Sequence, residues 1–104
     1  MELKVNFTNL DPSPAVESVI AEKAVKLKKY FEGKFHVQWN CTVEKGTHHS
    51  NVTLHGAHFD INAHASDDNL YKTIDHVLEK LEKQLLKKKE TVTNKHHEKV
   101  INRA

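Results

Sequence analysis

The chain has 104 residues, of which 38% are hydrophobic and 29% charged, and its formal net charge is +2. This length suits one domain with a small core, and the low counts of glycine (3) and proline (2) exclude collagen-like or linker sequence. One cysteine cannot form an internal disulfide, and no apolar run reaches the roughly 18–20 residues of a membrane span. Because the N-terminus also lacks the layout of a signal peptide, we expect a cytoplasmic protein.

The first third of the chain predicts a strand followed by a helix. Residues 2–8 alternate between apolar and polar side chains, which is typical of a half-buried strand. Ser13 and Pro14 predict a helix start, with serine as N-cap and proline at the first helical position. Apolar residues then recur every three or four positions from Val16 to Phe31, and Gly33 is the expected helix stop.

Three strands are predicted next. Residues 34–44 alternate over five cycles, which is the clearest strand pattern in the chain. We expect a loop over 45–50, a strand over 51–55, a tight turn at Gly56 and a further strand over 59–65.

A second helix is predicted to end the domain. The polar residues at 66–68 are expected to open it, and leucine, isoleucine and valine form an apolar stripe over 70–85. Residues 91–104 show no periodicity, so we expect a basic, disordered tail there. The predicted organisation is therefore one domain over 1–90 followed by this tail.

The element order β-α-β-β-β-α predicts the fold. Every strand has one apolar and one polar face, so the sheet needs a cover on one side only. We therefore expect a two-layer α+β domain like a double-stranded-RNA-binding domain, with two helices on one face of a four-stranded mixed sheet. The first two strands, joined through a helix, should run parallel if they are adjacent.

Charge is segregated on the second predicted helix. At ~100° per residue, its basic side chains fall within an arc of about 80°; they are Lys72, His76, Lys80, Lys83 and Lys87. The acids Asp68, Asp75, Glu79 and Glu82 form a separate stripe. A row of like charges repels itself, and a polyanion with repeating phosphates relieves that repulsion. The alternative is a lysine-rich helix end that complements the helix dipole, which explains Lys87, Lys88 and Lys89 but not Lys80 and Lys83.

The first predicted helix also carries lysines near its apolar face. Lys23 falls inside the apolar arc and Lys26 at its margin, and Lys28 and Lys29 follow. If the two helices pack side by side, Lys23 and Lys26 could face the lysines of the second helix and complete a basic track. The alternative is that each is an ordinary lysine that buries its aliphatic stem and keeps its ammonium in water.

Other chemistry finds little support in the residues. His55, His58 and His64 with Asp60 could bind zinc or copper, but no Cys-x-x-Cys or His-Glu-x-x-His spacing is present, so we expect no metal site. Cys41 is expected to be a core thiol. Without a nucleophile elbow or a Gly-rich phosphate loop, we expect no enzymatic activity, cofactor or small-molecule substrate.

The predicted outer face of the sheet bears on the kind of RNA that could bind. It carries amide, hydroxyl and histidine side chains but no Phe, Tyr or Trp, so base stacking of the kind seen in RRM domains is disfavoured. We expect recognition of RNA backbone and shape by the helices instead.

Several segments together resemble the ribosome hibernation promoting factor and protein Y family, over nearly all of residues 1–90. The segments are Val43-Glu44-Lys45 leading to His48-His49-Ser50, Leu70-Tyr71-x-x-Ile74-Asp75, Lys80-Leu81-x-Lys83-Gln84-Leu85-x-Lys87, and Ala24-x-Lys26-Leu27-x-x-Tyr30-Phe31.

The resemblance implies a non-enzymatic stationary-phase stress factor that binds 16S rRNA of the small ribosomal subunit across the mRNA and tRNA sites and stops translation. The short form of the family acts with ribosome modulation factor to form inactive ribosome dimers. The absence of a second domain and the basic end favour this short form over the long form or the protein Y type, which opposes dimers. The alternatives are a protein Y-type translation inhibitor that does not promote dimers and a generic double-stranded-RNA-binding module.

The family's rRNA contacts come from basic residues of both helices. The match implies RNA binding by Lys23, Lys26, Lys80, Lys83 and Lys87, and it extends less directly to Lys29, Lys88 and Lys89.

Overall fold

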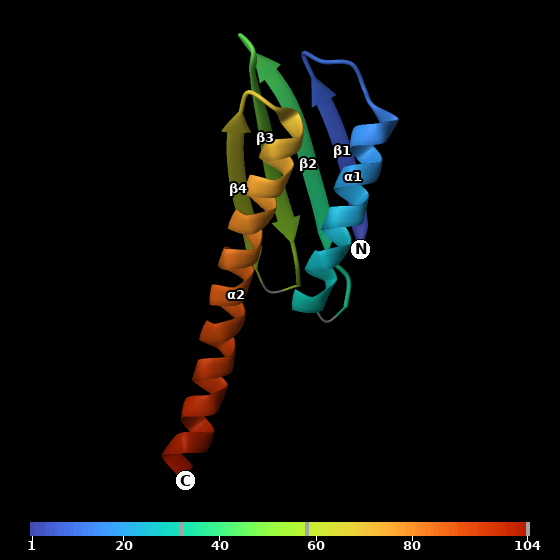
Figure 1. Cartoon of the computed structure of the whole chain (residues 1–104). Coiled ribbons are helices and arrows are strands. Elements are labelled where there is room, and N and C mark those ends of the chain that lie inside the picture. Colours follow the sequence, from blue (N-terminus) through green and yellow to red (C-terminus); the bar gives the residue numbers. More distant parts are fainter. Residues whose placement is uncertain (32, 58, 104) are drawn as a thin grey trace.

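The computed structural model describes residues 1–31, 33–57 and 59–103, with side chains described as far as Lys88. Two helices lie on one face of a single sheet, and the second helix extends well beyond it (Figure 1). The elements are β1 (Glu2–Thr8), α1 (Pro14–Ala24), the 3-10 helix η1 (Val25–Tyr30), β2 (His36–Glu44), β3 (Thr47–His55), β4 (Asp60–Asp67) and α2 (Leu70–Arg103).

The sheet has the strand order β1-β2-β3-β4. β1 runs parallel to β2, whereas the β2–β3 and β3–β4 pairs are antiparallel. One inner row of the register joins Val5, Trp39, Val52 and Ala63, so the apolar positions of all four strands share the face that the helices cover. The predicted mixed four-stranded sheet with two helices on one face is confirmed.

The predicted start of the first helix is also confirmed. Ser13 is the N-cap of α1 and its Oγ accepts a hydrogen bond from the Val16 N–H at 3.2 Å, with Pro14 in the first turn. The helix tightens into η1 after Ala24 and ends at Tyr30. Gly33 then adopts φ +102°, a left-handed conformation that favours glycine, as the chain turns toward β2.

The hairpin between β2 and β3 is tighter than predicted. Lys45 and Gly46 form a two-residue turn with φ values of 48° and 81°, and β3 begins at Thr47. The expected loop over 45–50 is therefore wrong. The prediction failed because His48 and Ser50 are polar residues on the inner face of β3, where alternation requires apolar side chains.

α2 starts later than predicted. β4 continues through Asp67, and Asn69 caps the helix through its Oδ1, which accepts hydrogen bonds from the Tyr71 N–H at 2.9 Å and the Lys72 N–H at 3.4 Å. Ser66 and Asp67 therefore end a strand, and Asp68 lies in the bend before the helix. Both aspartate and asparagine favour N-cap positions, so composition alone did not identify the cap.

The helix also ends later than predicted. α2 continues to Arg103, so the segment over 91–103 is helical where the sequence analysis expected a disordered tail. The lack of an apolar stripe suggested a tail, but the segment contains no glycine or proline, so no strong helix breaker lies within it.

A hydrogen-bonded chain inside the core fixes α2 against the sheet. The Trp39 Nε1–H donates to Ser50 Oγ at 3.3 Å, Ser50 Oγ lies 2.8 Å from Thr73 Oγ1, and Thr73 donates to the Leu70 carbonyl at 2.6 Å. Trp39, Ser50 and Thr73 thus satisfy one another's buried polar groups, as buried polar groups require. These hydrogen bonds link β2, β3 and α2, and they hold the Thr73 face of α2 against the sheet.

The thiol of Cys41 is part of the same core. Cys41 is fully buried, and burial raises its pKa to about 11 although a hydrogen bond with Ser50 opposes the shift. The thiol is therefore protonated at neutral pH, and the prediction of a core thiol is confirmed.

Candidate nucleic-acid interface

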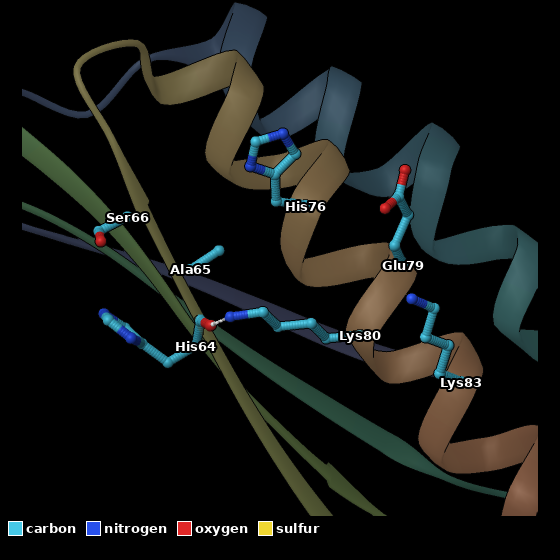
Figure 2. Close-up of a pocket in the computed structure, with 7 residues that line it drawn as sticks. All are labelled: His64, Ala65, Ser66, His76, Glu79, Lys80 and Lys83. Atoms are coloured by element: carbon cyan, nitrogen blue, oxygen red, sulfur yellow. Dashed lines mark hydrogen bonds between the residues drawn. The ribbon is translucent and has the colours of Figure 1, made fainter.

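Basic side chains of α2 line a groove against β4. The groove has a volume of about 420 Å³, and successive turns of α2 contribute to one side of it while β4 forms the other (Figure 2). Its lining residues are His64, Ala65, Ser66, His76, Glu79, Lys80 and Lys83. We call Lys72, Lys80, Lys83 and Lys87 the α2 lysine row, and all four are exposed.

Lys80 crosses the groove to the edge of the sheet. Its Nζ donates a hydrogen bond to the His64 carbonyl at 2.6 Å (Figure 2), and one turn further Gln84 Nε2 donates to the Asn62 carbonyl at 2.9 Å. An ammonium has three N–H donors, so Lys80 retains two for another partner. The contact to β4 therefore positions the charge without consuming it.

The other lysines of α2 that were predicted to bind RNA differ in where their side chains lie. Lys83 is exposed at the groove and makes no ion pair with any side chain that the structure describes. Lys88 lies off the row, with its Nζ 5.9 Å from the centroid of the Phe59 ring. The side chain of Lys89 lies outside the described part of the chain.

Two lysines, Lys23 of α1 and Lys29 of η1, face carboxylates of α2. Lys23 Nζ lies 2.5 Å from Asp75 Oδ1, and Lys29 Nζ lies 4.0 Å from Glu82 Oε2. The Tyr30 hydroxyl donates a hydrogen bond to the same Glu82 oxygen at 3.3 Å. The prediction that Lys23 faces the lysines of α2 is therefore wrong, because acidic residues of α2 lie on the side that packs toward α1.

The helical layer consequently carries charge in three stripes. We call Lys23 of α1 and Lys26 and Lys29 of η1 the first-helix lysines. The acidic stripe is Asp75, Glu79 and Glu82, of which Glu79 borders the groove. The α2 lysine row follows on the far side of Glu79. The structure thus brings Lys80 and Lys83 together at one groove but separates them from Lys23 and Lys29.

Spacing predicts only part of this separation. Asp75 and Glu82 are seven residues apart, so they lie on one side of α2, about 100° from the centre of the apolar stripe. The packing partner on that side was the missing information. The edge contacts of Lys80 and Gln84 carry no comparable sequence signal.

The outer face of the sheet is polar and uncovered. No Phe, Tyr or Trp lies on it within the four strands. His49 Nδ1 lies 3.1 Å from His64 Nε2, and His55 Nδ1 lies 3.0 Å from Asp60 Oδ1. His58, named as a possible ligand, lies outside the described residues, and the residues that are described contain no group of three or more metal-ligating side chains.

Among the residues that the structure describes, no helix combines the length and the apolar content needed to cross a membrane.

Comparison with known sequences gives one family over most of the chain. Residues 3–93 match the family described as Sigma 54 modulation protein / S30EA ribosomal protein. The ribosome hibernation promoting factor of Escherichia coli K12 is 34% identical over 90 residues, which cover 86% of this chain and 95% of that protein. The factor of the same name from Azotobacter vinelandii is 32% identical over 90 residues, covering 86% of this chain and 84% of that protein.

Comparison with solved structures gives the same fold. The N-terminal domain of Thermus thermophilus protein Y superposes with a TM-score of 0.77 at 20% identity, covering 82% of this chain and 96% of that domain. A ribosomal subunit interface protein from Coxiella burnetii superposes with a TM-score of 0.76 at 25% identity, covering 86% of this chain and 98% of that one.

Proposed function

We propose that this chain, which belongs to the Sigma 54 modulation protein / S30EA ribosomal protein family, binds the small ribosomal subunit through the phosphates of 16S rRNA. The family contains ribosome hibernation and subunit interface factors, and the resemblance stated from the sequence is confirmed. The proposed activity is binding, with no catalytic step.

The observation that carries the proposal is the α2 lysine row beside the groove of β4. Lys80 and Lys83 lie one turn apart at this groove, and Lys87 continues the row on the next turn. Each phosphate that such a row neutralises releases counterions, so the gain in free energy grows with the number of contacts and falls with salt.

The polar sheet face supports the mode of recognition. A face without Phe, Tyr or Trp offers no platform for stacked bases, whereas lysines read phosphate positions and hence RNA shape. We therefore assign the RNA contact to the helical layer: Lys80, Lys83 and Lys87 as the principal contacts, and Lys23, Lys26, Lys29 and Lys88 as further ones.

The consequence we propose for translation is inhibition by occupancy. A domain over 1–90 seated across the mRNA and tRNA sites would block both, and together with ribosome modulation factor it would favour inactive ribosome dimers during stationary phase. Beyond residue 90, α2 continues with Lys95, Lys99 and Arg103, and this basic segment supports the hibernation type over the protein Y type.

The test is co-sedimentation with purified small subunits across a salt series. We expect the wild-type protein to bind at 50 mM salt and to lose affinity steeply by 200 mM, and we expect Lys80→Gln/Lys83→Gln/Lys87→Gln to reduce the salt slope by two to three, at about one per phosphate contact.

The matched control removes three exposed lysines elsewhere, as Lys4→Gln/Lys34→Gln/Lys45→Gln. These side chains lie outside the helical layer. Because three lysines are replaced in each case, the control has the same net charge as the test variant. Equal losses from the two triple variants would contradict the site. An excess of duplex RNA that displaces the wild-type protein from subunits would instead favour a generic double-stranded-RNA binder.

A further inference from the structure

Two carboxylates of α2, those of Asp75 and Glu82, form ion pairs with lysines that the proposed function assigns to RNA binding. Lys23 and Asp75 form the shorter pair at 2.5 Å, with side chains 31% and 56% exposed. Lys29 and Glu82 form a looser pair at 4.0 Å. Both pairs join the first helix to α2 across the boundary between the helices.

A carboxylate beside a lysine takes the position that a phosphate oxygen would otherwise take. Lys23 keeps further N–H donors, but a phosphate that binds them lies close to the Asp75 carboxylate, so RNA must displace this carboxylate or be repelled by it. Because exposed ion pairs are weak, this exchange is feasible, but it disfavours any RNA that covers the acidic stripe. RNA whose phosphates meet the lysines on either side and leave the stripe uncovered avoids the repulsion.

Glu82 is held in place by more than its lysine. The Tyr30 hydroxyl donates to Glu82 Oε2 at 3.3 Å, and Lys29 Nζ lies 5.2 Å from the centroid of the Tyr30 ring. The carboxylate therefore has a second partner that RNA does not compete for directly. It should remain in the stripe even after Lys29 turns toward a phosphate.

We propose that Asp75 and Glu82 are specificity-determining residues, which reject continuous duplex RNA from the helical layer and admit a folded RNA surface with phosphates on both sides of the acidic stripe. The proposal rests on the proposed function and assigns to the same site its selectivity among RNAs. Asp75 should contribute more than Glu82, because its pair with the first-helix lysines is shorter.

The experiment measures two affinities for each variant, one for a 20-base-pair duplex RNA of arbitrary sequence and one for purified small subunits. We expect Asp75→Asn to raise the affinity for the duplex about threefold to tenfold and the affinity for subunits by less than about twofold. The affinity for subunits relative to the affinity for the duplex should therefore fall.

Glu44→Gln is the matched control. Glu44 is exposed and loses the same charge, but it lies at the end of β2, outside the helical layer and the groove, and it makes no ion pair among the described side chains. An equal gain in duplex affinity from Glu44→Gln would reduce the effect to net charge and overturn the proposal. An equal gain for duplex and subunit in Asp75→Asn, or no gain for either, would overturn it as well.

A double variant tests the pairing itself. In a Lys23→Gln background, Asp75→Asn should change the duplex affinity by less than half of its effect in the wild-type background, because the lysine that it releases is gone. An undiminished effect would contradict the exchange. The duplex measurements need no ribosome, so a wild-type protein that fails to bind subunits would disprove the proposed function separately from these results.

Discussion

The α2 lysine row and the first-helix lysines have the same chemistry and opposite surroundings. Lys83 faces a groove without a described carboxylate partner, whereas Lys23 is paired with Asp75 and Lys29 lies near Glu82. The difference arises from helix packing, because Asp75 and Glu82 of the acidic stripe lie on the side of α2 that packs toward α1 and η1. Lysines on two neighbouring helices therefore do not present equal positive charge to a polyanion.

The largest expected effect comes from reversing charge in each region. Lys83→Glu/Lys87→Glu should weaken binding to small subunits at least about thirtyfold at 0.1 M salt, because two phosphate contacts become repulsive. Lys26→Glu/Lys29→Glu should weaken subunit binding by about threefold to tenfold, since Lys29 already lies near the Glu82 carboxylate. Equilibrium binding of labelled protein measures both, and equal losses would remove the distinction between the two regions.

A smaller effect is expected from the ion pairs themselves. A double-mutant cycle with Lys23→Gln and Asp75→Asn should give a coupling free energy of unfolding of about 0.2–1 kcal/mol, the range for exposed pairs. The same cycle for Lys29 and Glu82 should give less, because their charged atoms are 4.0 Å apart. Urea unfolding measures both, and a larger coupling for the second pair would contradict the ranking.

The smallest effect is expected on the outer face of the sheet. Gln38→Ala removes an exposed side chain from the centre of this face and should change subunit affinity by less than about twofold. A loss of tenfold or more, with an unchanged circular dichroism spectrum, would place the RNA on the sheet and not on the helices.

Local patterns predicted most of the fold. Alternation identified β2, and Ser13 with Pro14 identified the start of α1, because each signal concerns an element's own exposed and buried sides. The hairpin at Lys45 was missed because Ser50 is a polar residue inside the core, satisfied there by Trp39 and Thr73. Burial of a polar side chain depends on partners distant in sequence, and alternation cannot register it.

The candidate site was predicted less completely. The periodicity of α2 correctly separated Lys80 and Lys83 from the acidic stripe, since angular positions on one helix follow from spacing alone. The predicted environment of Lys23 was wrong, because this environment depends on how two helices pack. Its partner Asp75 lies 52 residues further along the chain. Pairing across helices is a tertiary property that neither helix encodes by itself.

The hydrogen bonds from Lys80 and Gln84 to the carbonyls of β4 have a consequence for self-association. The margin of a sheet presents unsatisfied backbone groups that can recruit a strand from another molecule and so begin polymerisation. Two of these acceptors, on Asn62 and His64, are already occupied by side chains of α2. Helix α2 therefore covers part of this edge, and a strand from another molecule would have to displace Lys80 and Gln84 before it could pair with β4 at these two residues.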